Sequence, residues 1–199
     1  MEIAIILKAP KLNGVVKEND VIYADAGYNL KDQVGKKNVL AVVGDFDSLG
    51  RAPEGEKIVG LNVEKDFTDG ERAVRLSKEL GADKIVIYGA YGGKIEHVLG
   101  NIALLKIAKN IGLKAEIKDG DTVTELIGGT TYLSVKKNSK LSLIPYGGNC
   151  SFIDSKGLYY PLKGVRLTPS GTLGISNETT DSTVKIEFNS GEALVIYEI

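Results

Sequence analysis

The stretch Val39-Leu40-Ala41-Val42-Val43-Gly44-Asp45-Phe46-Asp47-Ser48 decides the fold of the first half of this chain. Its apolar run is short, as is typical of a buried strand in a parallel sheet. The two aspartates that follow are two positions apart, so on extended backbone their side chains point the same way. Such a pair is most easily explained by a hard cation such as Mg²⁺, which favours a few carboxylates plus substrate phosphates. A solvated turn fits these residues equally well, because Asp and Ser are common turn residues.

Strand and helix signals alternate around this stretch. Short apolar runs predict strands at 3–7, 21–24, 39–43, 84–88 and 113–117. Helical spacing predicts helices at 69–80 and 94–109, the second with Ile95, Leu99 and Ile102 on one apolar stripe. Strands that alternate with helices predict an α/β domain built on a mostly parallel sheet.

The pattern changes after about residue 120. Short β-branched runs at 130–135, 140–144, 150–153, 183–188 and 193–197 alternate with turn residues, and no helical period appears. The turn signals include Tyr146-Gly147-Gly148-Asn149 and Asn189-Ser190-Gly191. This half is predicted to be a C-terminal all-β, sandwich-like domain. The expected domains are 1–125 and 126–199.

Composition excludes several classes of function. The 199 residues carry 25 Lys and Arg against 26 Asp and Glu, a net charge of -1, which disfavours a nucleic-acid partner. Cys150 is the only cysteine, so the sequence holds no intrachain disulfide framework and no cysteine-based zinc site. No apolar stretch approaches the length of a membrane span. We therefore expect a cytoplasmic protein without a membrane partner.

A second acidic cluster, Lys65-Asp66-Phe67-Thr68-Asp69, precedes the first predicted helix. Asp66 or Thr68 suits the helix N-cap, and Asp69 suits the first turn, where the helix dipole favours an acid. Taken alone, capping explains the cluster better than catalysis does. Because the chain also carries the acidic pair Asp45 and Asp47, the two acidic clusters together favour a shared site.

A glycine-rich block, Gly89-Ala90-Tyr91-Gly92-Gly93-Lys94, leads from a strand into the second helix. Free backbone amides and a lysine at a helix start form an anion site, although a tight turn also accounts for the glycines. The block is not a P-loop, because Ile95 stands where that motif needs Ser or Thr. Lys94, His97 and Asn101 form a polar stripe along the helix.

Two further polar groups follow strands or lie among turn residues. Asp25 and Asn29 flank Gly27 after a predicted strand, where they are either turn formers or part of a strand-end ligand crevice. Ser176 and Asn177 belong to a dense polar patch in the β half that, taken alone, reads as a loop.

These blocks, in this order and spacing, resemble the thiamin pyrophosphokinase family over nearly the whole chain. The most specific part is Gly-Asp-Phe-Asp-Ser at 44–48, followed by Lys-Asp-x-Thr-Asp at 65–69 and by Gly-Gly-x-x-x-His with Asn four residues later at 92–101. The resemblance implies an α/β catalytic domain, a β domain and a homodimer with its site near the subunit interface. It implies transfer of the terminal diphosphate of ATP to the hydroxyl of thiamin, with Mg²⁺, to give thiamin diphosphate and AMP.

The resemblance also implies roles for individual residues. The implied metal ligands are Asp45, Asp47 and Asp69, and the implied catalytic set adds Lys94, Glu96 and His97. The implied ATP and phosphate contacts are Asp25, Asn29, Ser48, Lys65, Asp66, Thr68, Gly92, Gly93 and Asn101. The implied thiamin contacts are Ser176 and Asn177, from the same or the other subunit.

The chain departs from the family pattern at Tyr28, Lys94 and Glu96, where the family usually has Gly-Ala, Arg and Asp. Lysine keeps the charge of arginine without its planar fork, and glutamate moves the carboxylate by one methylene. Three other functions therefore stay open. They are diphosphate transfer to another primary alcohol such as a hydroxymethyl dihydropterin, binding of ATP or thiamin diphosphate without catalysis, and sugar-nucleotide transfer.

Overall fold

The computed structural model describes residues 1–46, 50, 51, 53–60 and 66–199, and it shows a strand-rich chain with few helices. Two compact units divide the chain, Met1–Gly120 and Asp121–Ile199. The division comes a few residues before the boundary expected from the sequence, because strand β7 (Thr122–Ser134) runs without a break across residue 125.

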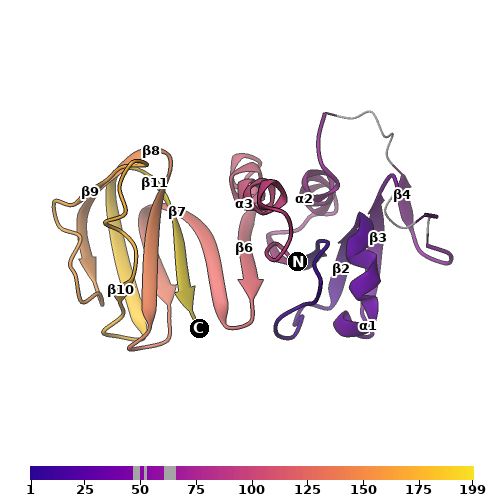
Figure 1. The fold of residues 1–199 in the computed structure, drawn as a ribbon, viewed down its shortest axis with the longest axis horizontal. Coiled ribbons are helices and arrows are strands. Elements are labelled where there is room, and N and C mark those ends of the chain that lie inside the picture. The colour runs from indigo at the N-terminus through magenta and orange to yellow at the C-terminus, as the bar shows by residue number, and fades with distance from the viewer. Residues whose placement is uncertain (47–49, 52, 61–65) are drawn as a thin grey trace. The chain divides into compact units, whose positions relative to one another are not determined.

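The first unit is built on a parallel sheet (Figure 1). Its strands, in the spatial order β6-β5-β1-β2-β3-β4, are β6 (Lys114–Asp119), β5 (Lys84–Tyr88), β1 (Glu2–Ile6), β2 (Asp20–Ala24), β3 (Asn38–Gly44) and β4 (Ile58–Gly60). Neighbouring strands along this path run parallel, as the short apolar runs predict. Strand β4 is too short to have been recognised from the sequence.

Both faces of this sheet are buried, which explains why its strands are continuously apolar. One face packs with a short 3₁₀ helix, η1 (Asp25–Leu30), and with α1 (Lys31–Val34), through Leu30, Val34 and strand residues such as Val21 and Tyr23. The helices α2 (Asp69–Glu79) and α3 (Ile95–Asn110) contribute nothing to that cluster. Because α2 contacts β1, β2 and β3, it covers the opposite face.

Helix α3 corrects one expectation from the sequence. The stripe expected to face inward is largely outside, since Ile95 is 69% exposed and Leu99 is 60% exposed. The side chains that α3 buries are Leu104, Leu105 and Ala108, in its second half. Apolar residues occur around this helix on more than one side, so the periodicity alone did not identify the face that packs. No helix in the described ranges is long and apolar enough to cross a membrane.

The second unit contains no helix and consists of antiparallel strands. They are β7, β8 (Lys140–Lys156), β9 (Arg166–Leu167), β10 (Asn177–Glu178) and β11 (Thr183–Glu198), with the order β10-β8-β11-β7 and β9 paired to β8. A core of its own includes Leu141, Phe152 and Val195. The free Cys150 is buried in that core.

Two turns expected in this half are wrong. The signals at 146–149 and 189–191 lie inside β8 and β11, each of which is one long strand. Gly147 and Gly191 do adopt positive φ, and the register between β8 and β11 shifts around them. A glycine inside a strand can mark a bulge that bends the strand rather than a turn that ends it.

Candidate functional site

The carboxyl edge of the parallel sheet gathers most of the residues singled out by the sequence. Strands β1 and β5 are neighbours, but the chain leaves β1 toward β2 and leaves β5 toward β6 on the other side. Open α/β sheets bind ligands at such a switch point, beyond the carboxyl ends of the strands. The segments that follow the strands there are residues 7–10 and the glycine-rich block 89–94.

Asp25 begins η1 directly after β2, with φ of +43°, a conformation that is uncommon outside glycine. Its Oδ1 atom is buried and has no hydrogen-bond partner in the described part of the chain. The end of β3 lies beside it, since a Cβ built on Gly44 would be 3.2 Å from both the Cα and the Cβ of Asp25. A strained residue with an orphaned carboxylate oxygen is the kind of feature that a bound cation or ligand donor would satisfy.

Asp45 follows Gly44 at the end of β3 and is half-buried, so two acidic side chains occupy adjacent strand ends. Asp47, Ser48 and Lys65 lie outside the described residues. Within the described ranges, no group of three or more His, Cys, Asp or Glu side chains is arranged to hold a metal ion. The donors present at this edge, carboxylate oxygens that include the orphaned one of Asp25, fit the oxygen preference of Mg²⁺.

The N-terminus of α2 meets the same edge. Thr68 is the N-cap, and its hydroxyl accepts a hydrogen bond of 3.1 Å from the backbone N–H of Glu71. Asp69 is the first helical residue and is half-buried, whereas Asp66 is exposed. Gly70 brings this turn against the end of β1, because an added Cβ would lie 3.3 Å from the side chain of Leu7. The capping interpretation of Thr68 is therefore confirmed.

We expect Thr68→Ala to lower the free energy of unfolding by about 1 kcal/mol, because it leaves the N–H of Glu71 without its side-chain acceptor. Thr68→Ser keeps a hydroxyl at the cap and should lose less than half of that. Urea denaturation followed by circular dichroism measures both. An alanine variant as stable as the parent protein would show that the cap does not stabilise α2.

The glycine-rich block connects β5 to α3. Gly89 has a φ of +73°, and a Cβ there would lie 2.5 Å from the carbonyl oxygen of Leu7, so only glycine fits this crossing. Lys94 is the N-cap of α3, and its side chain makes no capping hydrogen bond. The exposed residues around it are Gly92, Gly93, Glu96 and His97. Backbone amides and a lysine at the start of this sixteen-residue helix have the chemistry that favours an anion.

Asn101 does not lie free on the polar stripe of α3. Its Nδ2 donates a hydrogen bond of 3.0 Å to the carbonyl of Ala90, and the residue is half-buried. This contact ties the second turn of α3 to the glycine-rich block, so Asn101 helps to hold the block in place.

Tyr28, one of the departures from the family pattern, belongs to a polar cluster beside this edge. Its hydroxyl lies 2.9 Å from Lys31 Nζ and donates to Glu56 Oε1 at 3.2 Å, while Lys31 also forms an ion pair with Glu56. The hydrogen bond that Lys31 Nζ donates to Glu56 Oε1 raises the pKa of Lys31 above its ordinary value. Burial raises the pKa of the adjacent Tyr23 to about 12. The cluster ties Glu56, which lies two residues before β4, to Tyr28 of η1 and Lys31 of α1. Asn29, in the same 3₁₀ helix, is exposed.

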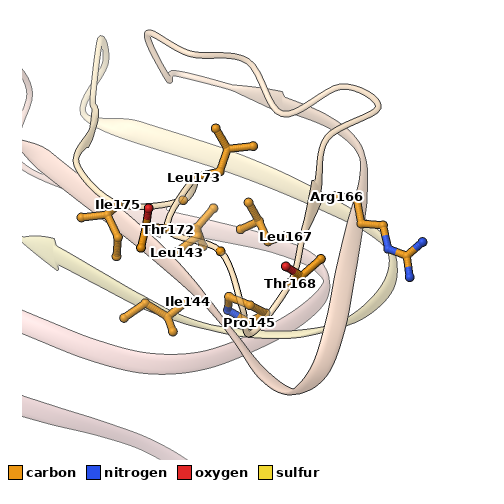
Figure 2. Close-up of a pocket in the computed structure, with 11 residues that line it drawn as sticks. Leu143, Ile144, Pro145, Arg166, Leu167, Thr168, Thr172, Leu173 and Ile175 are labelled. Carbon is orange, nitrogen blue, oxygen red and sulfur yellow. The ribbon is translucent and has the colours of Figure 1, made fainter.

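The second unit carries two adjoining pockets. One, of about 410 Å³, is walled mainly by apolar residues that include Leu143, Leu167 and Leu173, and Arg166 extends away from them (Figure 2). The other, of about 310 Å³, is lined by two segments, residues 160–162 and residues 173–177, together with Leu143, Val165 and Leu167. Mostly apolar walls with a few polar groups are typical of small-molecule sites.

Ser176 and Asn177 both line the smaller pocket, but differently. Ser176 is exposed, with φ of +60°, and its backbone N–H donates a hydrogen bond of 3.0 Å to Ser142 Oγ. Asn177 is 8% exposed, and its side chain bonds to the backbone of Tyr160 and Glu178.

Sequence reasoning missed two parts of these surfaces. The first is the segment 7–10 after β1, which lies at the switch point. Lys8 and Pro10, close behind a buried strand, are the residues that could have indicated this segment in the sequence. Tyr160 could not be separated from Tyr146 and Tyr159 by sequence, because neighbouring aromatic residues carry no signal of which one lines a pocket. The structure places Tyr160, and neither of the others, in the wall of the smaller pocket.

Comparison with known proteins gives matches over both units. Residues 15–117 match the family described as "Thiamin pyrophosphokinase, catalytic domain", and residues 130–192 match "Thiamin pyrophosphokinase, vitamin B1 binding domain". A thiamine pyrophosphokinase of Bacillus subtilis is 32% identical over 161 residues, which are 77% of this chain and 75% of that protein.

Solved structures agree with the sequence matches. The crystal structure of thiamine pyrophosphokinase from Bacillus subtilis superposes with a TM-score of 0.86 at 26% identity, covering 100% of this chain and 99% of that one. The structure of thiamin pyrophosphokinase from Geobacillus thermodenitrificans gives a TM-score of 0.82 at 27% identity, covering 100% and 98%.

Proposed function

Because this chain belongs to the thiamin pyrophosphokinase family, we infer that it transfers the terminal diphosphate of ATP to the hydroxyl of thiamin and releases AMP. The observation that carries the inference is the order of the two family matches. The catalytic match lies within the first unit, and the vitamin-binding match lies within the second. The division of roles that we propose is therefore an α/β catalytic domain followed by a sandwich-like β domain that binds thiamin.

The carboxyl edge of the parallel sheet is the proposed ATP site. Magnesium would be held by Asp45, Asp47 and Asp69, and its charge would offset the negative charge of the diphosphate. Asp25 supports this assignment, because its buried Oδ1 needs a cation or a donor. Lys65, Lys94 and the amides at the start of α3 are the proposed phosphate contacts.

The chemistry requires little covalent work from the chain. The hydroxyl of thiamin attacks the β-phosphorus of ATP, the bond to the α-phosphate oxygen breaks, and AMP leaves. The residues of the site align the hydroxyl with that bond and stabilise the developing charge. Asp69 or Glu96 is the proposed acceptor of the hydroxyl proton, and His97 and Asn101 complete the floor of the site.

We propose the smaller pocket of the second unit as the acceptor site, with Ser176 and Tyr160 among the residues that line it. Tyr160 is largely exposed, and we propose its ring as the aromatic surface on which the acceptor stacks. We also propose that the protein acts in the cytoplasm as a homodimer.

The test is an assay of AMP release by the purified protein with Mg-ATP and thiamin. We expect AMP and thiamin diphosphate in equal amounts, and EDTA should abolish both. AMP release with a hydroxymethyl pterin but not with thiamin would overturn the acceptor. Binding of thiamin without AMP release would indicate a sensor protein rather than an enzyme. Release of pyrophosphate would indicate nucleotidyl transfer.

A further inference from the structure

We propose that Asn177 is a positioning residue that acts on the acceptor through Tyr160 rather than by touching the acceptor itself. This proposal rests on the proposed function, because it concerns the pocket assigned to thiamin. It corrects the direct contact that the family resemblance implies for Asn177. The hydrogen bonds of the Asn177 side-chain amide support this role.

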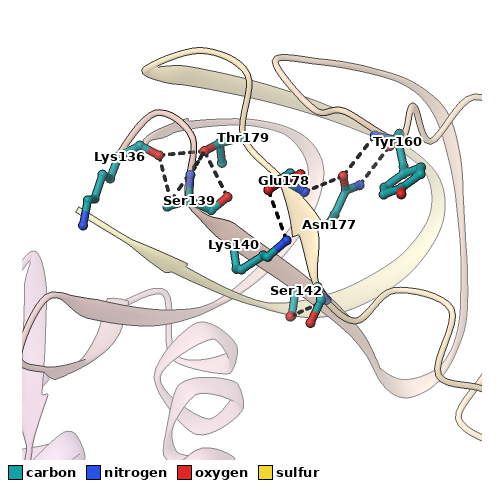
Figure 3. A network of polar contacts seen from close by, with 9 residues as sticks. Lys136, Ser139, Lys140, Ser142, Tyr160, Asn177, Glu178 and Thr179 are labelled. Atoms are coloured by element: carbon teal, nitrogen blue, oxygen red, sulfur yellow. Dashed lines mark hydrogen bonds and ion pairs between the residues drawn. The ribbon is translucent and has the colours of Figure 1, made fainter.

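The amide of Asn177 binds both backbone groups of a single residue. Tyr160 N–H donates to Asn177 Oδ1 at 3.1 Å, and Asn177 Nδ2 donates to the carbonyl of Tyr160 at 2.8 Å (Figure 3). The N–H of Glu178 donates to the same Oδ1 at 2.7 Å. Both lone pairs of the amide oxygen are therefore used, and the partners fix which end of the amide is oxygen.

These bonds join two segments that line the smaller pocket. One segment is Tyr160, Pro161 and Leu162, and the other is residues 173–177. Tyr160 lies outside any strand. The side chain of Asn177 therefore supplies the two backbone hydrogen bonds that a neighbouring strand would otherwise make. A hydroxyl side chain is too short to bind both groups, and a carboxylate would present oxygen to the carbonyl of Tyr160. An amide of this length satisfies both groups of Tyr160 at once.

The ring of Tyr160 is what this clamp positions. It is 62% exposed and packs edge-on against Tyr159, with centroids 4.9 Å apart. The next part of the wall is held independently, because the N–H of Leu162 donates to Ser155 Oγ at 2.9 Å. Loss of the Asn177 amide should therefore loosen Tyr160 while Leu162 stays in place.

The first test is amide hydrogen exchange by NMR in Asn177→Ala, which does not depend on any ligand. We expect exchange at Tyr160 to accelerate at least about tenfold, the order of one lost hydrogen bond, with exchange at Leu162 unchanged. Unchanged protection of Tyr160 would overturn the clamp, whatever the protein catalyses.

The second test is a double-mutant cycle on the KM for thiamin, with Asn177→Asp and Tyr160→Ala. The aspartate keeps the accepted bonds and loses the donated one, so we expect the fold to be retained. Asn189→Asp is the matched control, because Asn189 lines neither pocket. We expect Asn177→Asp to raise the KM for thiamin about tenfold and to leave the KM for Mg-ATP unchanged. In the Tyr160→Ala background the same change should have almost no effect.

Multiplicative effects in the cycle would show a direct contact between Asn177 and thiamin and would overturn the proposal. Absence of thiamin turnover in the parent protein would instead reject the proposed function, and hydrogen exchange would still decide whether the clamp exists.

Discussion

Asp45→Asn should lower the turnover of Mg-ATP and thiamin by about a hundredfold to a thousandfold, the order of effect of removing one preorganised electrostatic contact from a reaction site. The change replaces a carboxylate by an amide of the same shape at the end of β3, directly after Gly44, which lies against Asp25. A neutral oxygen binds Mg²⁺ more weakly, so the diphosphate would keep its charge as the hydroxyl approaches. Folding should be little affected, because the side chain is half-buried and keeps its volume.

The measurements are AMP release at saturating substrates and calorimetric titration with Mg²⁺ and a non-hydrolysable ATP analogue. Asp32→Asn is the matched control, since Asp32 is exposed on α1 and outside the proposed site. It should retain the parent activity. An Asp45→Asn protein that turns over and binds the magnesium complex normally would remove Asp45 from the metal ligands. Asp47→Asn, at the second acid of the pair, should behave as Asp45→Asn does.

Gly27→Ala should destabilise the first unit by about 3 kcal/mol or more, at the upper end of the usual overpacking cost. A Cβ on Gly27 would lie 2.1 Å from the carbonyl oxygen of Ile6 and 2.9 Å from its carbonyl carbon. These are backbone atoms of the central strand β1, so relief requires movement of η1 away from the sheet. Since η1 starts with Asp25, that movement would also displace the acidic edge.

Urea denaturation measures the loss, with Gly60→Ala as the control. No atom of the residues that the structure describes lies within 4 Å of a Cβ built on Gly60 in strand β4, so this variant should stay within about 0.5 kcal/mol of the parent. Equal stability of the Gly27 and Gly60 variants would mean that the crossing of η1 over β1 is looser than the structure shows. Activity of the Gly27 variant should fall together with its stability.

The alternation of apolar runs and acidic or glycine-rich blocks was enough to predict the parallel sheet and the two longer helices of the first unit. This succeeded because a strand buried on both faces needs a continuous apolar run, and because α2 has a threonine N-cap that is recognisable locally. The blocks at strand ends also predicted that Asp25 and Asp45 lie at neighbouring strand ends, since parallel strands bring their carboxyl ends together. The family resemblance rests on the same blocks and is confirmed.

Local sequence did not determine which side of α3 would pack. Ile95 and Leu99 repeat with a helical period, yet Leu104 and Leu105 are the residues that become buried. A period indicates that one side is apolar, whereas the neighbouring elements determine which side finds a partner. The same reasoning applies to β8 and β11, where glycines that resemble turn formers become bulges because long partner strands continue past them.

The sequence by itself thus determined the classes of the two halves, the acidic edge and the family. Only the tertiary structure decided what each polar side chain does there. Asn101 is tied to Ala90, and Asn177 binds Tyr160 across 17 positions of the chain. The physical reason is that a polar side chain is satisfied by whichever group folding brings to it, and local sequence does not specify a partner brought close by the fold.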